Sequence, residues 1–227
     1  MPTREEILAQ LAEDLHAFCS ADLAGADLNS ASLENVDFFD TDLSNANLDG
    51  AILDGACLDA ANLEGASLKK ASLKKAKLES AVLNKTDLTE ADFTEALLPD
   101  SQIDEAKVDG TIFVKCDMEN CSLYDTKGKG AKFNNSKLYL ASLDYGDFSH
   151  SDFTYCNLQF ASFRETKLIG AIMIKALLKE SRLIKTDLEN ADLSGAIMEG
   201  ADLQGANLKN TKLTGAVLRG VKNKPTE

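Results

Sequence analysis

The sequence predicts an all-β solenoid, because three observations point to one short unit that turns and repeats. A five-residue repeat starts near Ala21 and keeps one frame to Gly220, forty units without an insertion or deletion. The third residue of each unit is large and apolar, Leu in 27 units and Phe in seven, and the first residue is small, Ala in 24. Of the 14 glycines, 12 occupy the last position of a unit.

A period of five is neither helical nor simply strand-like. A helix buries positions at a spacing of 3.6 residues and a flat strand at a spacing of two. Here the first and third residues of a unit must point inward together, so each unit is a short extended segment followed by a turn. A turn whose third residue needs φ > 0 recruits glycine there, as type II turns do. Repeated turning around one inward stripe makes a solenoid.

Four units, or 20 residues, are expected to make one circuit. Phe93, Phe113, Phe133 and Phe153 then stack in one interior column, the structural core spine. Stacked coils are separated by one strand spacing of about 4.8 Å, which brings rings 20 residues apart into contact. The grouping of these four phenylalanines favours a four-sided coil.

Gly128 is the one third-position residue that is not apolar. A missing side chain leaves a hole in the core that costs about 1–3 kcal/mol unless it is filled. Phe148 lies one coil later in the same column and follows the small Gly146, so we expect it to lean into the space. The alternative is a backbone bulge that exposes the basic segment 126–130.

The chain resembles the pentapeptide repeat family through its A-(D/N)-L-x-x pattern, seen at residues 26–30, 46–50 and 201–205. The resemblance covers about nine tenths of the chain. It implies a right-handed quadrilateral β-helix, here of about ten four-sided coils over residues 21–220.

The two ends of the chain differ. Residues 1–20 are expected to form an N-terminal capping α-helix from Thr3 to Cys19, because Thr3 and Glu6 fit a capping box. Its apolar face, which would cover the open first coil, holds Ile7, Leu8, Leu11, Leu15 and Phe18. Residues 221–227 form a short polar tail that offers no comparable cap.

Homodimerisation through the C-terminal coils is one way to cover the last coil. The outward residues Leu177, Ile197 and Val217 recur every 20 residues and form a candidate dimer ladder. The alternative is that they are ordinary exposed aliphatics, which are common on protein surfaces.

Composition narrows the possible compartments. No apolar run is long enough to span a bilayer and no leader resembling a signal peptide is present, so we expect a cytoplasmic protein without membrane association. Five cysteines, an odd number, do not suggest a disulfide framework. Cys116, Cys121 and Cys156 occupy the small inward position, whereas Cys57 faces outward and is expected to be the most reactive.

The net charge of −13 is unevenly distributed, because residues 1–66 hold 14 acidic side chains against one basic, Arg4. This end is either an acidic handle for a basic partner or a by-product of Asp being the default second residue of a unit. A belt of lysines follows, and we expect it to pair with acidic neighbours or to be solvated, so direct nucleic-acid binding is not expected. Its members are Lys69, Lys70, Lys74, Lys75 and Lys77.

Outward aromatic and aliphatic residues supply a candidate interaction patch, because exposed aromatics favour interfaces. The alternative is that they cover one another and stabilise the stack. The patch consists of Tyr139, Leu140, Phe160, Tyr145 and Tyr155.

Catalytic and metal-binding motifs are absent from the sequence. The two histidines, His16 and His150, are far apart, and no Cys-x-x-Cys pair, phosphate loop or nucleophile elbow occurs. We therefore expect no catalytic residue, no metal, no cofactor and no enzyme activity.

The expected function is that of a non-enzymatic scaffold or regulator that binds a protein partner. The resemblance implies an alternative, a DNA mimic that binds DNA gyrase or another topoisomerase and confers quinolone or toxin resistance. The uninterrupted frame and the near-neutral later coils argue against the mimic. A structural spacer is a third interpretation.

Overall fold

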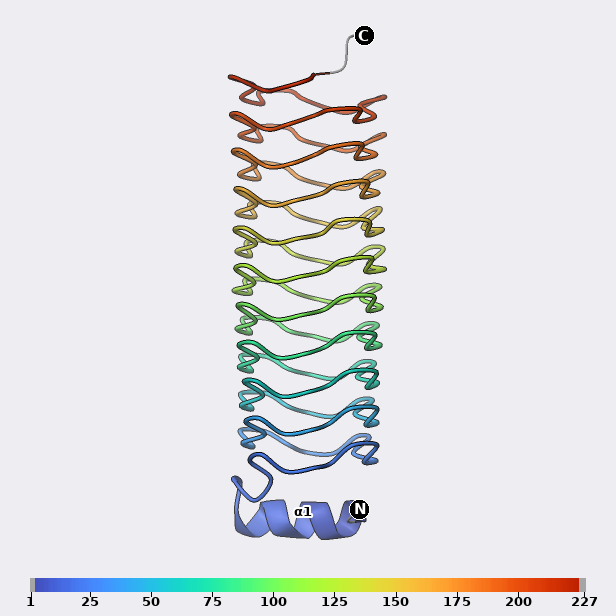
Figure 1. The fold of residues 1–227 in the computed structure, drawn as a ribbon, viewed down its shortest axis with the longest axis vertical. Coiled ribbons are helices and arrows are strands. Elements are labelled where there is room, and N and C mark those ends of the chain that lie inside the picture. Colours follow the sequence, from blue (N-terminus) through green and yellow to red (C-terminus); the bar gives the residue numbers. More distant parts are fainter. Residues whose placement is uncertain (1–2, 225–227) are drawn as a thin grey trace.

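The chain forms a tall column of stacked coils with one helix across its N-terminal end (Figure 1). The structure is a computed structural model that describes residues 3–224. Each coil holds 20 residues, because the second residue of each unit pairs in a parallel bridge with the residue 20 positions later, from Asp22–Asp42 up to Asp202–Lys222. Within residues 3–224 strands are reduced to these one-residue bridges, since a turn interrupts every extended segment.

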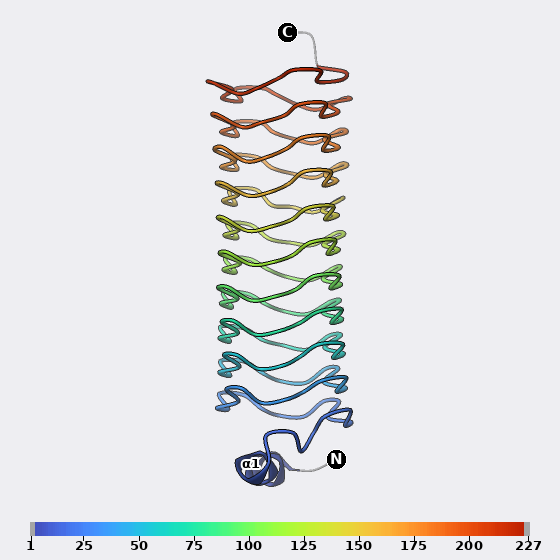
Figure 2. The same cartoon turned by 90° about the vertical axis from the view of Figure 1, so that its left-hand side faces the viewer.

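Each coil has four sides, with one unit on each side. In the first coil side 1 is residues 21–25, side 2 is 26–30, side 3 is 31–35 and side 4 is 36–40, and residues 20 apart lie on the same side one coil further on. The fourth and fifth residues of a unit form the turn, which we call the corner after that side. Both views show this regular stacking (Figures 1 and 2).

Backbone hydrogen bonds join each coil to the next in one repeated pattern. The N–H of Leu23 donates to the carbonyl of Asp42 at 2.8 Å, and the N–H of Asp42 donates back to the carbonyl of Ala21 at 2.9 Å. The corner is closed by the N–H of Ala26, which donates to the carbonyl of Leu23 at 3.0 Å. Buried backbone groups are therefore paired between coils rather than within a sheet of long strands.

The fifth residue of every unit adopts a left-handed backbone. Its φ lies between 50° and 70° in all forty units, although only 12 of these residues are glycine. The turn therefore demands a positive φ at every corner, and the other 28 corners carry a residue for which that conformation is unfavourable unless the residue is Asn or Asp.

The interior is a column of apolar side chains with an aromatic stack on side 3. The rings of Phe93 and Phe113 lie 5.1 Å apart between centroids, those of Phe113 and Phe133 5.1 Å, and those of Phe133 and Phe153 4.6 Å. The interplanar angles are 25°, 12° and 2°, so the rings stack nearly parallel along the axis.

Gly128 is accommodated by packing and not by a bulge. Its N–H donates to the carbonyl of Asp147 at 2.9 Å, the regular bond of this position. A Cβ added at Gly128 would lie 2.8 Å from the ring of Phe148 and 2.7 Å from Val108. A Cβ added at Gly146 would lie closer still to the Phe148 ring, which is fully buried. The expectation that Phe148 fills the space is confirmed, and no basic loop bulges out.

The helix α1 spans Arg4–Glu13 and begins with the expected capping box between Thr3 and Glu6. Its buried residues Ile7 and Leu11 face the first coil. Figure 2 looks along the axis of α1 and shows that the helix covers only part of the column's width.

The expected helix to Cys19 was too long, and Leu15 does not join the buried face. The chain leaves the helix at Asp14, and Leu15 is 46% exposed. The physical reason is that the first coil has unpaired edge groups: the Leu15 carbonyl accepts from the N–H of Asp37 at 2.9 Å. The Phe18 carbonyl likewise accepts from the Thr41 hydroxyl at 2.7 Å, with the Phe18 ring buried.

The C-terminal end is less covered. Leu208, Leu213 and Leu218 are only partly buried, unlike their counterparts in earlier coils. The repeat pairing does not stop at Gly220, because Lys222 still forms a bridge with Asp202. The expected tail therefore begins two residues later than predicted, and residues 225–227 lie outside the described part of the chain.

We predict that Gly128→Ala destabilises the fold by about 1–3 kcal/mol, because the new methyl group overpacks the core against Phe148. Adding Phe148→Leu should recover part of this loss, and a double-mutant cycle from thermal or urea unfolding measures the coupling.

Gly130→Ala is the matched control for this cycle. Gly130 has open space around its Cβ position but a φ of +67°, so its cost is purely conformational. That cost should be unaffected by Phe148→Leu. Equal coupling for both glycines would contradict the packing explanation.

Candidate interaction surfaces

An apolar cluster occupies the corner after side 4. The rings of Tyr139 and Phe160 meet edge-on with centroids 5.5 Å apart, and Leu140 lies one coil below Phe160 in the same position. Leu140 is 50% exposed and Phe160 41%. We call Tyr139, Leu140 and Phe160 the corner patch.

The other two candidate residues lie at different corners. Tyr145 belongs to the corner after side 1, where its ring lies 5.1 Å from that of Tyr124. Tyr155 belongs to the corner after side 3, where the Lys175 ammonium lies 5.4 Å from its ring centroid. The five residues therefore do not form one patch, although Tyr145 and Tyr155 lie at the corners on either side of the corner patch.

Four large residues at these corners adopt a backbone conformation that their side chains disfavour. Leu140, Tyr145, Tyr155 and Phe160 all have φ between 60° and 64°. A left-handed conformation costs a residue with a Cβ about 1–2 kcal/mol, and each of the four is at least 41% exposed. Folding alone would favour Gly or Asn here, so these residues are candidates for function.

The candidate dimer ladder is continuous along side 4. Leu177 bridges to Ile197 and Ile197 to Val217, so the three residues lie in direct succession along the column. Leu177 is half-buried, whereas Ile197 is 36% and Val217 40% exposed.

The acidic residues of the first coils have a structural task. Asp22, Asp27, Asp37 and Asp42 each accept a hydrogen bond from the backbone N–H two residues later, at 2.9–3.2 Å. This local bond stabilises the turn. In residues 3–224, the ion pairs of this acidic end are His16–Asp37 at 2.7 Å and Lys85–Glu64 at 3.1 Å. Turn chemistry therefore accounts for the second-position Asp residues.

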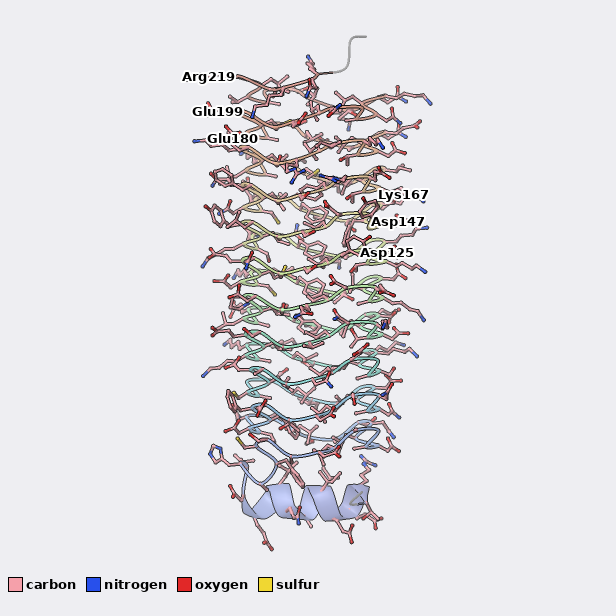
Figure 3. All side chains as sticks on the ribbon, in the orientation of Figure 1. Asp125, Asp147, Lys167, Glu180, Glu199 and Arg219 are labelled. Atoms are coloured by element: carbon pink, nitrogen blue, oxygen red, sulfur yellow. The ribbon has the colours of Figure 1, made fainter. Side chains whose placement is uncertain are left out.

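Most of the lysine belt pairs with acidic neighbours, which is one of the two alternatives expected from the sequence. Four of its members reach carboxylates one coil higher: the pairs are Lys69–Asp87, Lys70–Glu90, Lys74–Asp92 and Lys75–Glu95, at 3.4–3.9 Å. Charged side chains of both signs follow each other along the column edges, as the labelled residues show (Figure 3).

The cysteines divide into inert and accessible groups. Cys116, Cys121 and Cys156 are buried, and the thiols of Cys116 and Cys156 donate to the carbonyls of Phe93 and Phe133 at 2.9 and 2.8 Å. Burial raises the pKa of Cys116 and of Cys156 to about 12. Cys57 is only half-buried, but Cys19 is exposed. The structure therefore favours Cys19, and not the expected Cys57, as the most reactive thiol.

Residues 3–224 contain neither a metal-binding cluster nor a membrane-spanning helix. No group of three or more His, Cys, Asp or Glu side chains is placed to hold a metal ion. No helix there is long and apolar enough to cross a membrane.

A profile of pentapeptide repeats matches the chain in eight copies, over residues 20–55, 56–95, 131–170, 161–200 and 181–220. The chain belongs to the pentapeptide repeat family. No curated protein sequence matched it.

Several solved pentapeptide repeat proteins are similar. HetL from the cyanobacterium Nostoc sp. strain PCC 7120, described as involved in heterocyst differentiation regulation, is 25% identical with a TM-score of 0.68, covering 100% of this chain and 99% of HetL. A protein from the Arabidopsis thaliana thylakoid lumen is 33% identical over 40% of this chain and 68% of its own, with a TM-score of 0.36. The fluoroquinolone resistance protein QnrB1 is 17% identical over 88% and 90%, with a TM-score of 0.33. The last two superpose too poorly to bear on function.

Sequence reasoning missed the conformational cost of the apolar corner residues. The signal was available, because Leu140, Tyr145, Tyr155 and Phe160 all occupy the fifth position of a pentapeptide unit, where glycine is concentrated. Treating every fifth position as left-handed would have separated these four from the outward residues at the second position, such as Ile172.

We predict that Cys19 is the one cysteine to react rapidly with a chromogenic disulfide reagent at pH 8. Cys57 should react slowly, because burial raises the pKa of its thiol. The three buried cysteines should react only after denaturation, bringing the total to five. Cys19→Ser should remove the fast phase, and a fast phase that survives this change would contradict the assignment.

We predict that acid destabilises the fold through its turn aspartates. Hydrogen bonds from the Phe39 backbone and the His16 side chain lower the pKa of Asp37, and those from the Ser194 side chain and backbone lower the pKa of Asp192. A lowered folded-state pKa adds stability above the unfolded pKa of about 4, which is lost as pH falls further. The melting temperature should therefore decrease below about pH 4.

The matched variant is Asp37→Asn combined with Asp192→Asn. Asn62 shows that an Asn accepts the same turn bond, from the N–H of Glu64 at 3.1 Å. The variant should fold as the wild type does at pH 7. Between pH 6 and pH 3 its melting temperature should decrease less than that of the wild type. An unchanged acid loss would exclude these two carboxylates as contributors.

Proposed function

We propose that this pentapeptide repeat protein is a non-enzymatic regulator that acts by binding another protein through the corner patch. The observation that carries the proposal is the combination of exposure and unfavourable φ at Leu140 and Phe160. Asn occupies the same corner position one coil below, at Asn120 with φ of 56°, so a residue better suited to the turn was available. The presence of Leu and Phe at this corner is therefore explained by a contribution to binding and not to folding.

The chemistry of the patch suits a protein partner. Tyr139 and Phe160 form a rigid edge-to-face pair, and aromatic pairs bury large areas at little cost in side-chain entropy. The similarity to HetL over the full length of both chains supports a regulatory role, because HetL is described as involved in regulation. The acidic residues of the first coils are explained by their hydrogen bonds in the turns, so mimicry of DNA is not needed to explain their presence.

Two further expectations belong to this proposal. The partly buried Leu208, Leu213 and Leu218 favour covering of the last coil by a second copy, with Leu177, Ile197 and Val217 beside the contact. The working compartment is the cytoplasm. The N-terminal segment 1–20, which contains α1, serves as the cap that keeps the N-terminal end of the column from associating with another copy.

The experiment that tests the proposal compares the wild type with a variant carrying Leu140→Asn and Phe160→Asn. Asn tolerates the left-handed corner, so the melting temperature should stay within a few degrees of the wild type or rise. Immobilised full-length proteins are used to capture partners from a lysate of the native host, followed by quantitative mass spectrometry. A partner retained by the wild type should be lost at least tenfold with the variant.

The control is Ile172→Asn, which removes an exposed aliphatic residue from side 3, away from the corner patch. This control should retain the partner. Equal capture by all three proteins, with the corner variant folded, would overturn the proposal.

A further inference from the structure

Two arginines occupy neighbouring positions on side 1 of successive coils. Arg164 is the fourth residue of its unit and Arg182 is the second residue of the unit one coil above. In residues 3–224, neither guanidinium lies within ion-pair distance of an acidic side chain, whereas 13 lysines do.

The same geometric relation produces ion pairs elsewhere on the column. A fourth-position lysine reaches a second-position aspartate 18 residues later in Lys69–Asp87 at 3.6 Å, Lys74–Asp92 at 3.4 Å and Lys129–Asp147 at 3.4 Å. Arg164 and Arg182 occupy these two positions with like charges. Like charges in contact are unfavourable unless an anion joins them.

The acidic residues around the arginine pair are already engaged. Asp144 accepts from the Arg164 backbone N–H at 2.8 Å, and Asp202 from the Gln204 N–H at 3.1 Å. Glu165 pairs with Lys185 at 2.9 Å and Glu180 with Lys222 at 3.2 Å. Neither Asp144 nor Asp202 lies within ion-pair distance of the two guanidinium groups, and the two glutamates pair with lysines instead.

The same unit holds the two buried side-chain polar atoms that lack a hydrogen-bond partner in residues 3–224, Ser162 Oγ and Arg164 Nε. Elsewhere the serine of this position donates to the fourth-position Asp one coil below, as Ser67 does to Asp49 and Ser72 to Asp54, both at 2.6 Å. Asp144 stands in that position for Ser162 but does not accept from it. Unpartnered buried donors cost free energy, which a ligand acceptor removes.

Apolar side chains border this charged site on both sides. Phe160 lies at the corner that precedes side 1 and Tyr145 at the corner that follows it, each 41% exposed. In Figure 3 these corners correspond to the opposite edges labelled by Glu180 and Asp125, so side 1 runs between them. A cationic centre between two aromatic borders fits a carboxylate flanked by apolar groups.

We propose that Arg164 and Arg182, with Ser162, form a carboxylate-binding site that docks an extended acidic segment of a partner protein. Arginine forks bind carboxylates through paired N–H donors, which gives the site its specificity. The segment lies along side 1, with its acidic side chain between the guanidinium groups and apolar side chains against Phe160 and Tyr145. This proposal rests on the protein-binding function above and adds the chemistry of the partner.

The test uses a phage-displayed library of random linear 12-residue peptides selected on the full-length protein. Counter-selection uses a variant carrying Arg164→Ser and Arg182→Ser, since serine already occupies the fourth position of side 1 at Ser44 and the second position at Ser122, Ser142 and Ser162. Enriched peptides should combine Asp or Glu with an aromatic or aliphatic residue nearby. Their Kd, from fluorescence anisotropy at fixed salt, should increase at least tenfold with the double variant.

Two controls separate the outcomes. Arg219→Ser, an arginine at the corner after side 4, should leave the Kd unchanged, and the double variant should melt no lower than the wild type because a like-charged pair is removed. Peptides without a carboxylate, or equal binding by the double variant, would overturn the arginine site. If the enriched peptides bind the arginine double variant as tightly as the wild type but no longer bind the Leu140→Asn and Phe160→Asn variant, the corner patch remains supported and the arginine site does not. Calorimetric binding of inorganic phosphate, with no peptide enriched, would assign a small-anion site and overturn docking.

Discussion

The whole structure depends on the parallel hydrogen bonds that join each coil to the next, so that second-position residues 20 apart form bridges. Each coil donates and accepts along all four sides, so a single inserted residue would turn every following side chain to the wrong face. This explains why forty units run without an insertion or deletion. It also explains the small first residue and large third residue, which share a narrow interior. Only the second, fourth and fifth positions remain to carry anything specific to one protein.

Much of this outward surface still serves the fold. Second-position Asp and Asn close the turns, and fourth-position Asp binds the next coil, as Asp49 does with Ser67 and Lys69. Lysines pair with carboxylates on neighbouring coils. Among the features without such a task are the large apolar residues at left-handed corners, the ladder on side 4 and the arginine pair on side 1.

The period and the four columns could be predicted because each is written directly in the residue spacing, and so could the capping box and the filling of Gly128 by Phe148. The end of α1 could not, because it depends on the Asp37 N–H, an edge group that exists only once the first coil has formed. The exposure of Cys19 could not be predicted for the same reason, because Cys19 lies in the segment between the end of α1 and the first coil. The arginine pair was missed because 18-residue neighbours are visible only after the coil geometry is known. The right-handed sense implied by the family resemblance stays a prediction.

The corner patch and the arginine pair lie within the column rather than at its ends, and the repeat architecture gives a reason. In a solenoid each coil touches only its neighbours, so a substitution at one outward corner stays local and does not propagate through the core. The two ends are constrained differently, because they must cover apolar side chains and unpaired backbone edges. Residues 139–182 span the sixth to the ninth of the ten coils, so complete coils lie on each side of them. A binding surface there can tolerate unfavourable corner residues and a like-charged pair, because the surrounding coils supply the stability that those groups reduce.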